Sequence, residues 1–321
     1  MKILYSIHGY PPHLNAGAEM MLHDLAKFFI SKGHEVKVLI PEPMVTGVQN
    51  PYQFDGVWVH PRRKNVWEEH YKWADVVFTH LGETPFALQT CRTMDKHCVF
   101  FAHNTWLYSD LKEAEKRGNV SVVYNSQFAK EELGYNLPNY VLTPPCDFRK
   151  YDNGKDPYDN RYITIINFNE NKGGMEFFEI ARRMPDRKFL AVKGSYGDQC
   201  NIFPDNVRVI ENTTEIMKVY GNTRILCMPS AYESWGRTAT EAMCSGIPVI
   251  ANDTSGLEEN LGKAGLFCKR DRISEWVRQI ELLDDKSLYD YVSKKCRERS
   301  RELDPLPQME GLLKFIECQI G

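Results

Sequence analysis

The sequence predicts an α/β protein built from two doubly wound domains, and three observations favour this. Apolar runs of strand length alternate with amphipathic stretches of helix length. The same strand, loop, helix and strand order begins near residue 2 and again near residue 162. The chain has 321 residues, of which 42% are hydrophobic, and this is enough for two ordinary cores. We therefore expect two domains of about 150 residues each.

The first domain is predicted to span residues 1–150. Its opening strand, at residues 2–7, leads through a loop into a helix near 18–32 that Gly33 ends. A strand at 35–40 then completes a right-handed βαβ unit. Further strands are expected at 56–60, 76–80 and 98–103, each ending in a histidine, and a last strand is followed by a helix capped near Ser126.

The second domain is predicted to span residues 151–304. Three prolines, several acids and turn residues between 140 and 160 interrupt the periodicity, as in a linker. A strand at 162–166, a helix at 175–184 and a strand at 188–193 then repeat the βαβ start. Two amphipathic helices follow at 273–284 and 287–302, and Pro305 and Pro307 precede a last helix at 309–319.

The stretch from Met228 to Asp253 carries the chemistry of the second domain. It contains an apolar strand, an acidic loop with glycine, a helix and another apolar strand, which together make a βαβ crossover. Glu233 precedes the helix and Glu241 lies on its second turn. A helix N-terminus attracts anions, and carboxylates accept hydrogen bonds from sugar hydroxyls, so the pair suits a sugar nucleotide. By spacing alone, a helix-capping acid beside an unrelated surface acid explains the pair equally well.

Composition narrows the class of protein and its environment. A net charge of −3 gives no general reason to expect a nucleic-acid partner. The nine cysteines are scattered without a C-x-x-C pair, which favours free thiols, a reducing cytoplasm and no zinc site. The N-terminus does not resemble a signal peptide, and no run of eighteen apolar residues occurs. We expect a cytoplasmic protein, and a peripheral membrane contact is compatible with this.

The run ESWGRTATEAMCSGIPVIAND, at residues 233–253, resembles the signature of the family 4 retaining glycosyltransferases, which belong to the glycosyl transferases group 1. The resemblance implies the GT-B fold, in which two Rossmann-like domains with parallel sheets face each other across a cleft. It also implies that residues 305–321 pack back on the N-terminal, acceptor-binding domain. The implied activity is retaining transfer of a hexose or related sugar from a nucleotide-diphosphate sugar to an acceptor hydroxyl, without a metal or other cofactor.

The same resemblance assigns residues to the donor. Lys172 with Gly173 is similar to the family's K-G pair, whose lysine binds the donor diphosphate. Many members carry an arginine five residues earlier, where this chain has Asn167, so Arg237 is expected to supply the missing charge. The donor-binding set implied is Gly17, Asn167, Lys172, Gly194, Ser234, Trp235, Gly236, Arg237, Thr238 and Glu241.

The catalytic set implied by the resemblance is His103, Lys172, Glu233 and Arg237. Glu241 is expected to hold the ribose, whereas Glu233 and His103 orient the hexose. His103 stands in a segment similar to the family's F-H-T/N motif, and His80 is a second candidate.

Two alternatives stay open at the level of the sequence. One is a non-catalytic module that binds sugar nucleotides or glycans, because Asn167 replaces an arginine. The other is a glycosyltransferase whose acceptor is a hydroxylated base in nucleic acid, with the basic residues 62–64 and the rings of Trp67 and Trp73 as its support. A solvated loop before a core helix is the commoner explanation of that segment. Otherwise the acceptor is expected to be a saccharide, a lipid-linked sugar or a small molecule.

Overall fold

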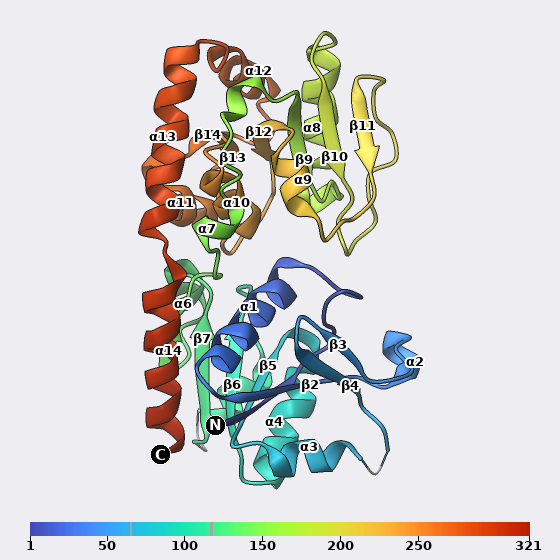
Figure 1. The fold of residues 1–321 in the computed structure, drawn as a ribbon, viewed down its shortest axis with the longest axis vertical. Coiled ribbons are helices and arrows are strands. Elements are labelled where there is room, and N and C mark those ends of the chain that lie inside the picture. The colour runs from blue at the N-terminus through green and yellow to red at the C-terminus, as the bar shows by residue number, and fades with distance from the viewer. Residues whose placement is uncertain (65, 116–117) are drawn as a thin grey trace. The chain divides into compact units, whose positions relative to one another are not determined.

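The computed structural model describes residues 1–64, 66–115 and 118–321 (Figure 1). The chain divides into two compact units. The first, unit 1, comprises Met1–Pro145 together with Pro305–Gly321, and the second, unit 2, comprises Cys146–Asp304. The predicted boundary at residue 150 thus lies a few residues into unit 2. None of the helices in the described residues is long and apolar enough to span a membrane.

Unit 1 contains an eight-stranded sheet with the order β3-β4-β2-β1-β5-β6-β7-β8. The strands are parallel except for β3, which pairs antiparallel with β4 at the edge and which the periodicity did not predict. The strands are β1 (Lys2–Ser6), β2 (Glu35–Ile40), β3 (Tyr52–Phe54), β4 (Val57–Pro61), β5 (Val76–His80), β6 (His97–Ala102), β7 (Val120–Tyr124) and β8 (Asn139–Val141). The helices are α1 (Gly17–Ser31), α2 (Pro43–Thr46), α3 (Trp67–Trp73), α4 (Thr84–Thr93), α5 (Ser109–Ala114) and α6 (Gln127–Leu133). Ser126 caps α6 by accepting a hydrogen bond from the backbone N–H of Ala129 (3.0 Å), as predicted.

The last helix, α14 (Pro305–Ile320), completes the core of unit 1. Leu312 and Ile316 are fully buried in the same apolar cluster as β1, β2 and β5. The helix begins four residues earlier than predicted, at Pro305 rather than near residue 309. The two prolines do not break it, because the first turn of a helix needs no backbone N–H donors.

Unit 2 contains a six-stranded, fully parallel sheet with the order β11-β10-β9-β12-β13-β14. The strands are β9 (Tyr162–Ile166), β10 (Phe189–Val192), β11 (Val207–Ile210), β12 (Thr223–Met228), β13 (Val249–Asn252) and β14 (Leu266–Cys268). The helices are α7 (Phe148–Tyr151), α8 (Gly174–Arg183), α9 (Ile216–Tyr220), α10 (Arg237–Cys244), α11 (Ser255–Leu261), α12 (Ile273–Leu282) and α13 (Lys286–Glu302). Counted within the unit, this is the 3-2-1-4-5-6 order of a doubly wound dinucleotide-binding fold.

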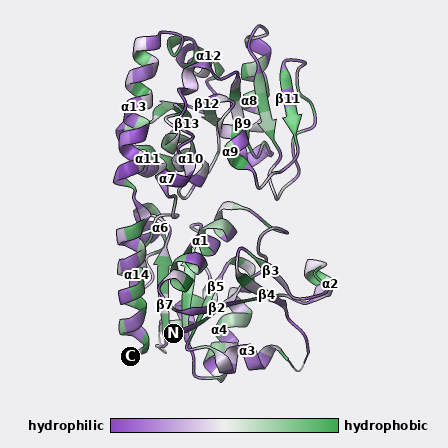
Figure 2. Cartoon of the chain, viewed as in Figure 1, coloured by the Kyte–Doolittle hydropathy of each residue, from purple (hydrophilic) through white to green (hydrophobic). Residues whose placement is uncertain are grey.

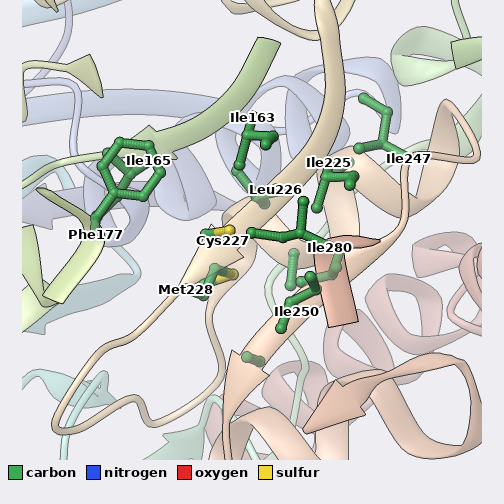
Figure 3. Packing of buried hydrophobic residues seen from close by; sticks show 14 of the residues in the cluster. Ile163, Ile165, Phe177, Ile225, Leu226, Cys227, Met228, Ile247, Ile250 and Ile280 are labelled. Carbon is green, nitrogen blue, oxygen red and sulfur yellow. The ribbon is translucent and has the colours of Figure 1, made fainter. Parts of the chain in front are cut away.

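The core of unit 2 packs around the central strands. Figure 3 shows Ile163 and Ile165 of β9 near Ile225 to Met228 of β12, with Phe177 of α8 and Ile280 of α12 in the same cluster. Both faces of a parallel sheet are covered, so its strands are almost continuously apolar. Figure 2 accordingly shows β7 and β10 in the green of hydrophobic residues, whereas α13 is mostly purple.

Each sheet has one point at which the strand order reverses. In unit 2 it lies between β9 and β12, and in unit 1 between β1 and β5. Doubly wound sheets bind ligands beyond the carboxyl ends of the strands at this point. The residues that follow these four strands are therefore the first place to look for a site.

Candidate functional site

Lys172 follows β9 at the reversal point of unit 2, in a short 3₁₀ turn, Glu170–Lys172. The next residue, Gly173, has a left-handed backbone (φ +81°), and a Cβ placed on it would lie 2.3 Å from the carbonyl oxygen of Pro229. Only glycine satisfies both conditions without displacing the backbone. The K-G pair thus packs directly against the start of the loop that follows β12.

Lys172 and Glu233 form an ion pair between the segment after β9 and the loop after β12. The Lys172 ammonium donates to Oε1 of Glu233 at 2.5 Å, and the Ser230 hydroxyl donates to the same oxygen at 3.0 Å. Burial lowers the pKa of Lys172, but the Glu233 carboxylate and the Tyr196 hydroxyl outweigh it and leave the pKa above its usual range. The lysine is therefore charged and positioned at the end of β9.

Two hydrogen bonds to backbone carbonyls fix the loop that carries Glu233. The N–H of Ala231 donates to the carbonyl of Asn171 (2.8 Å), and the side-chain amide of Asn252 donates to the carbonyl of Ser230 (2.9 Å). These bonds join the ends of β9, β12 and β13. The carboxylate of Glu233, which is about one-tenth exposed, is held on a rigid frame.

The N-terminus of α10 is shaped by Asn260, which sequence reasoning missed. Its fully buried amide donates to the carbonyls of Trp235 (2.9 Å) and Gly236 (3.0 Å), and its Oδ1 accepts from the Thr240 hydroxyl (3.0 Å). Gly236 caps the helix with a left-handed backbone (φ +82°). The turn before α10 is thereby fixed, with the first backbone N–H groups of the helix beyond it.

Two further residues expected to bind the donor, Ser234 and Thr238, lie at the N-terminal end of α10. Ser234 is buried in the same turn. Thr238 is half-buried in the first turn, where its hydroxyl contacts the sulfur of Met228 at 3.7 Å. The indole of Trp235 is buried and donates to Thr240 (3.2 Å), so it packs inside unit 2.

Arg237 and Glu241 form an ion pair with each other. The Nε of Arg237 donates to Oε1 of Glu241 (2.8 Å), while Oε2 accepts from the hydroxyl of Tyr220 (2.7 Å). Another guanidinium nitrogen of Arg237 donates to the hydroxyl of Tyr151 (3.2 Å). The i,i+4 spacing of Arg237 and Glu241 could have indicated this pair. In this structure Arg237 neutralises Glu241, whereas the sequence pattern suggested a free cation for the diphosphate.

A hollow of about 430 Å³ lies beside Tyr151, the hydroxyl partner of Arg237. Tyr151 lines it together with Lys150 of α7 and residues 214–218, which lead into α9. Ile216 and Met217 give it an apolar wall. A larger hollow of about 440 Å³, between residues 154–157 and α13, touches none of the predicted site residues.

Asn167 and Gly194 lie side by side beyond β9 and β10. A Cβ on Gly194 would come within 2.3 Å of the Asn167 side chain. Asn167 is buried, has a left-handed backbone (φ +62°) and accepts a hydrogen bond from Gln199 (3.0 Å). Gln199 also accepts from the backbone N–H groups of Phe168 and Gly194. An amide network thus occupies the position where an arginine was expected.

The remaining predicted residues belong to unit 1. Gly17 is exposed and begins α1, and His103 directly follows β6. Burial, with His8 as the second cause, lowers the pKa of His103 to about 3, so the ring is neutral. Its ring centroid lies 5.1 Å from that of His80, which ends β5. Neither His8 nor Glu19 was among the site residues expected from the sequence.

His8, Glu19 and His80 form a cluster at the reversal point of unit 1, in which Glu19 and His80 are buried and His8 is about one-third exposed. The Nε2 atom of His8 lies 3.3 Å from Oε1 of Glu19, and the Nε2 atom of His80 lies 3.9 Å from it. Burial raises the pKa of Glu19 to about 7 and lowers those of His8 and His80. His60, the third strand-end histidine, contacts His70 instead, at 4.7 Å between ring centroids.

The basic segment after β4 packs on unit 1. Arg62 pairs with Glu83 and with Glu42 (3.1 Å) and lies 3.8 Å above the ring of Phe86. Trp67 packs against Phe86 and Tyr71, while Lys37 lies over the ring of Trp73. Residue 65, within this segment, lies outside the described residues. The arrangement agrees with a charged loop before a core-packing helix.

Part of the chain is similar to a known family. Residues 200–300 match the family model of the Glycosyl transferases group 1. An uncharacterized glycosyltransferase of Haemophilus influenzae is 28% identical over 150 residues, which are 43% of this chain and 40% of the relative. A D-inositol 3-phosphate glycosyltransferase of Corynebacterium aurimucosum is 30% identical over 125 residues, 33% of this chain and 30% of the relative. The matches thus span less than half the length of these relatives.

Solved structures share the fold over the whole chain. A sucrose-phosphate synthase from Thermosynechococcus elongatus has a TM-score of 0.78 at 14% identity, covering 100% of this chain and 99% of the other. Anabaena HepE in complex with UDP-glucose also has a TM-score of 0.78, at 16% identity and 99% and 100% coverage. At such identities the likeness establishes the fold, and the predicted GT-B class is confirmed.

Proposed function

We propose, from the match of residues 200–300 to the family model of the Glycosyl transferases group 1, that the chain transfers a hexose or related sugar from a nucleotide-diphosphate sugar to an acceptor hydroxyl. The observation that carries the proposal is the Lys172–Glu233 pair at the reversal point of unit 2, next to the N-terminus of α10. This places one cation, one carboxylate and a helix N-terminus where a doubly wound sheet binds nucleotides.

In the proposed complex the donor diphosphate meets Lys172 and the first turn of α10. The lysine supplies a full positive charge, and the helix end supplies N–H donors with about half a charge of its own. Together they stabilise the charge that develops on the leaving diphosphate. In this proposal no metal ion is needed at the diphosphate. Glu233, which shares Lys172 with the phosphate, accepts hydrogen bonds from the hexose hydroxyls.

Glu241 is proposed to hold the ribose. Each carboxylate oxygen has two lone-pair sites, so Glu241 can accept a ribose hydroxyl while it keeps Tyr220 and Arg237 as partners. Arg237 then acts by holding the Glu241 carboxylate in position. The hollow beside Tyr151, with its apolar wall of Ile216 and Met217, is the proposed place of the base.

The proposed stereochemistry is retention. The acceptor hydroxyl attacks the anomeric carbon from the face that the nucleotide leaves, and the leaving phosphate oxygen takes its proton. We assign no carboxylate nucleophile. Exclusion of water from the reacting centre limits donor hydrolysis. His103 and Gly17 of unit 1 are proposed to contact the hexose and the acceptor, and a cytoplasmic location remains part of the proposal.

Thermal unfolding with a panel of UDP-, GDP- and ADP-linked sugars tests the proposal. We expect one nucleotide series to raise the unfolding temperature of the wild type, because a ligand that binds only the folded state stabilises it. Release of free nucleotide in the presence of acceptor sugars is then measured for the donor that binds. Binding without release or transfer would favour the non-catalytic alternative, and the absence of stabilisation by every nucleotide sugar would refute the proposal.

Two variants separate the roles within the site. Glu241→Ala and Lys172→Ala are both expected to abolish transfer while the chain remains folded by far-UV circular dichroism. Full donor turnover in both variants would contradict the assignment of the site, even if the wild type were active.

The nucleic-acid alternative loses part of its local support. An α-glucosyltransferase solved with UDP and a DNA 13-mer shares the fold at a TM-score of 0.69, but at 15% identity this likeness concerns the fold alone. The Arg62 guanidinium is engaged by Glu42, Glu83 and Phe86. We therefore place the acceptor among saccharides, lipid-linked sugars or small molecules.

A further inference from the structure

The cluster of His8, Glu19 and His80 in unit 1 has the donor set of a metal site. Two imidazoles and one carboxylate are a frequent ligand set of Zn²⁺ sites that keep an open fourth position. The three residues come from different places in the sequence: the loop after β1, the first turn of α1 and the end of β5. Their sequence spacing therefore gave no sign of a metal site, and the expectation of no metal rested on the cysteine spacing and on the family resemblance.

The geometry fits a small divalent ion. The Nε2 atoms of His8 and His80 lie 3.3 and 3.9 Å from Oε1 of Glu19, and all three atoms lie within 4.8 Å of one another. An ion about 2.0–2.2 Å from each ligand in a tetrahedral site would hold the ligand atoms about 3.3–3.5 Å apart. A small rearrangement of the side chains brings the present positions to these values.

The two buried members of the cluster, Glu19 and His80, have no lysine or arginine partner among the described residues. Glu19 is 2% exposed and His80 is 0% exposed, and the ion-pair partners of Glu19 in the described ranges are His8 and His80 alone. Across residues 1–64, 66–115 and 118–321, neither ring nitrogen of His80 nor Oε2 of Glu19 has a hydrogen-bond partner. Buried polar atoms are normally partnered, and each exception requires an explanation.

We propose that His8, Glu19 and His80 bind one divalent transition-metal ion of the Zn²⁺ class through His8 Nε2, Glu19 Oε1 and His80 Nε2. Imidazole nitrogen selects such ions over Mg²⁺ and Ca²⁺, which prefer oxygen ligands. The open fourth position takes an oxygen ligand at the reversal point of the unit 1 sheet. The inference does not rest on the proposed transferase activity, since the site lies in unit 1 and binding is measured without a donor.

Cobalt binding tests this directly. The untagged full chain is stripped with a chelator, desalted and titrated with Co²⁺, whose visible absorption reports its coordination. We expect saturation at one equivalent, with the bands of a four- or five-coordinate ion and without a thiolate charge-transfer band, and we expect Zn²⁺ to displace it. The absence of saturable binding, or a thiolate band that shows cysteine ligands instead, would overturn the proposal.

Matched variants identify the ligands. Glu19→Gln keeps the size of the buried side chain, and His8→Gln changes the least buried member of the cluster. Both are expected to weaken Co²⁺ binding by about 100-fold or more, given that even outer-shell changes cost 10- to 100-fold. His60→Gln, at a histidine outside the cluster, is the control and should bind as the wild type does. Circular dichroism verifies folding, and unchanged affinity in both cluster variants would refute the site.

Discussion

The ammonium of Lys172 lies 2.5 Å from Oε1 of Glu233, and this contact joins the ends of two strands that are neighbours only because the sheet reverses there. The pair is shielded on both sides, with 21% of the lysine and 11% of the glutamate side chain exposed. A phosphate that approaches Lys172 therefore meets a charge already desolvated and oriented by the protein.

Replacing the lysine should weaken donor binding. In Lys172→Met we expect the Kd for the donor to rise about 10- to 100-fold, because a hydrogen bond to a charged group contributes about 1.5–3 kcal/mol. Isothermal titration calorimetry with the stabilising nucleotide sugar measures this. Lys286→Met, which removes an exposed lysine paired with Asp156 and Asp290, is the control and should leave the Kd unchanged. An unchanged Kd in Lys172→Met would mean that the lysine does not bind the diphosphate.

Gly173 should be intolerant of a methyl group. The left-handed backbone costs Ala about 1–2 kcal/mol, and displacing the carbonyl of Pro229 adds about 1–3 kcal/mol, so we expect Gly173→Ala to lower the free energy of unfolding by about 2–5 kcal/mol. Gly154→Ala is matched in backbone conformation (φ +67°) but has no atom within 4 Å of the added Cβ. Urea unfolding should show a loss of about 1–2 kcal/mol there. Equal losses of stability in the two variants would mean that the contact with Pro229 does not contribute to the effect of Gly173→Ala.

Asn260 should couple stability to donor binding. Asn260→Ala leaves the buried carbonyls of Trp235 and Gly236 without their donor, and we expect about 2–4 kcal/mol of lost stability. The turn before α10 loosens, so the donor Kd rises as well. Asn222→Ala, which removes an exposed amide bond to Lys218, should cost less than about 0.5 kcal/mol. A destabilised Asn260→Ala variant with unaltered donor affinity would exclude this turn from the site.

His70 should make stability fall in acid. Burial, with His60 and Lys37 as further causes, lowers the pKa of His70 in the folded chain to about 4, whereas the unfolded value is near 6.5. Between these values the unfolded state binds more protons, so stability declines as the pH falls from about 6.5 to 4. Urea midpoints should decline less steeply in His70→Gln than in the wild type, and an exposed-site control, His13→Gln, should follow the wild type. If the urea midpoints of the wild type and both variants fell equally with pH, groups other than His70 would be responsible for the acid sensitivity.

Much of the architecture was readable from local patterns. Apolar runs predict the strands at residues 35–40, 76–80 and 162–166, and one hydroxyl predicts the helix cap at Ser126. Both signals depend on only a few neighbouring residues. Strand β3 was missed because three residues are too few to show a period. The early start of α14 was missed because proline was taken as a break where the first turn accepts it.

The residues of the candidate site could be predicted from the sequence only where the family signature contains them. Lys172, Glu233 and Glu241 could be named, but three supporting residues could not. Tyr220 contacts Glu241, Asn260 fixes the turn before α10 and Gln199 contacts Asn167, and all three come from segments without any motif. The cluster of His8, Glu19 and His80 depends on β1 and β5 being neighbours. Strand order arises from the packing of the whole unit, and no local pattern encodes it.

The composition of unit 1 from two separate segments bears on how the chain is made. Residues 146–304 are continuous, so unit 2 can close its core as soon as they leave the ribosome. Unit 1 completes its core later, because Leu312 and Ile316 are the last part of that core to be synthesised. The domain translated first is thus the one finished last, and until then the apolar surface that α14 covers is open to chaperones.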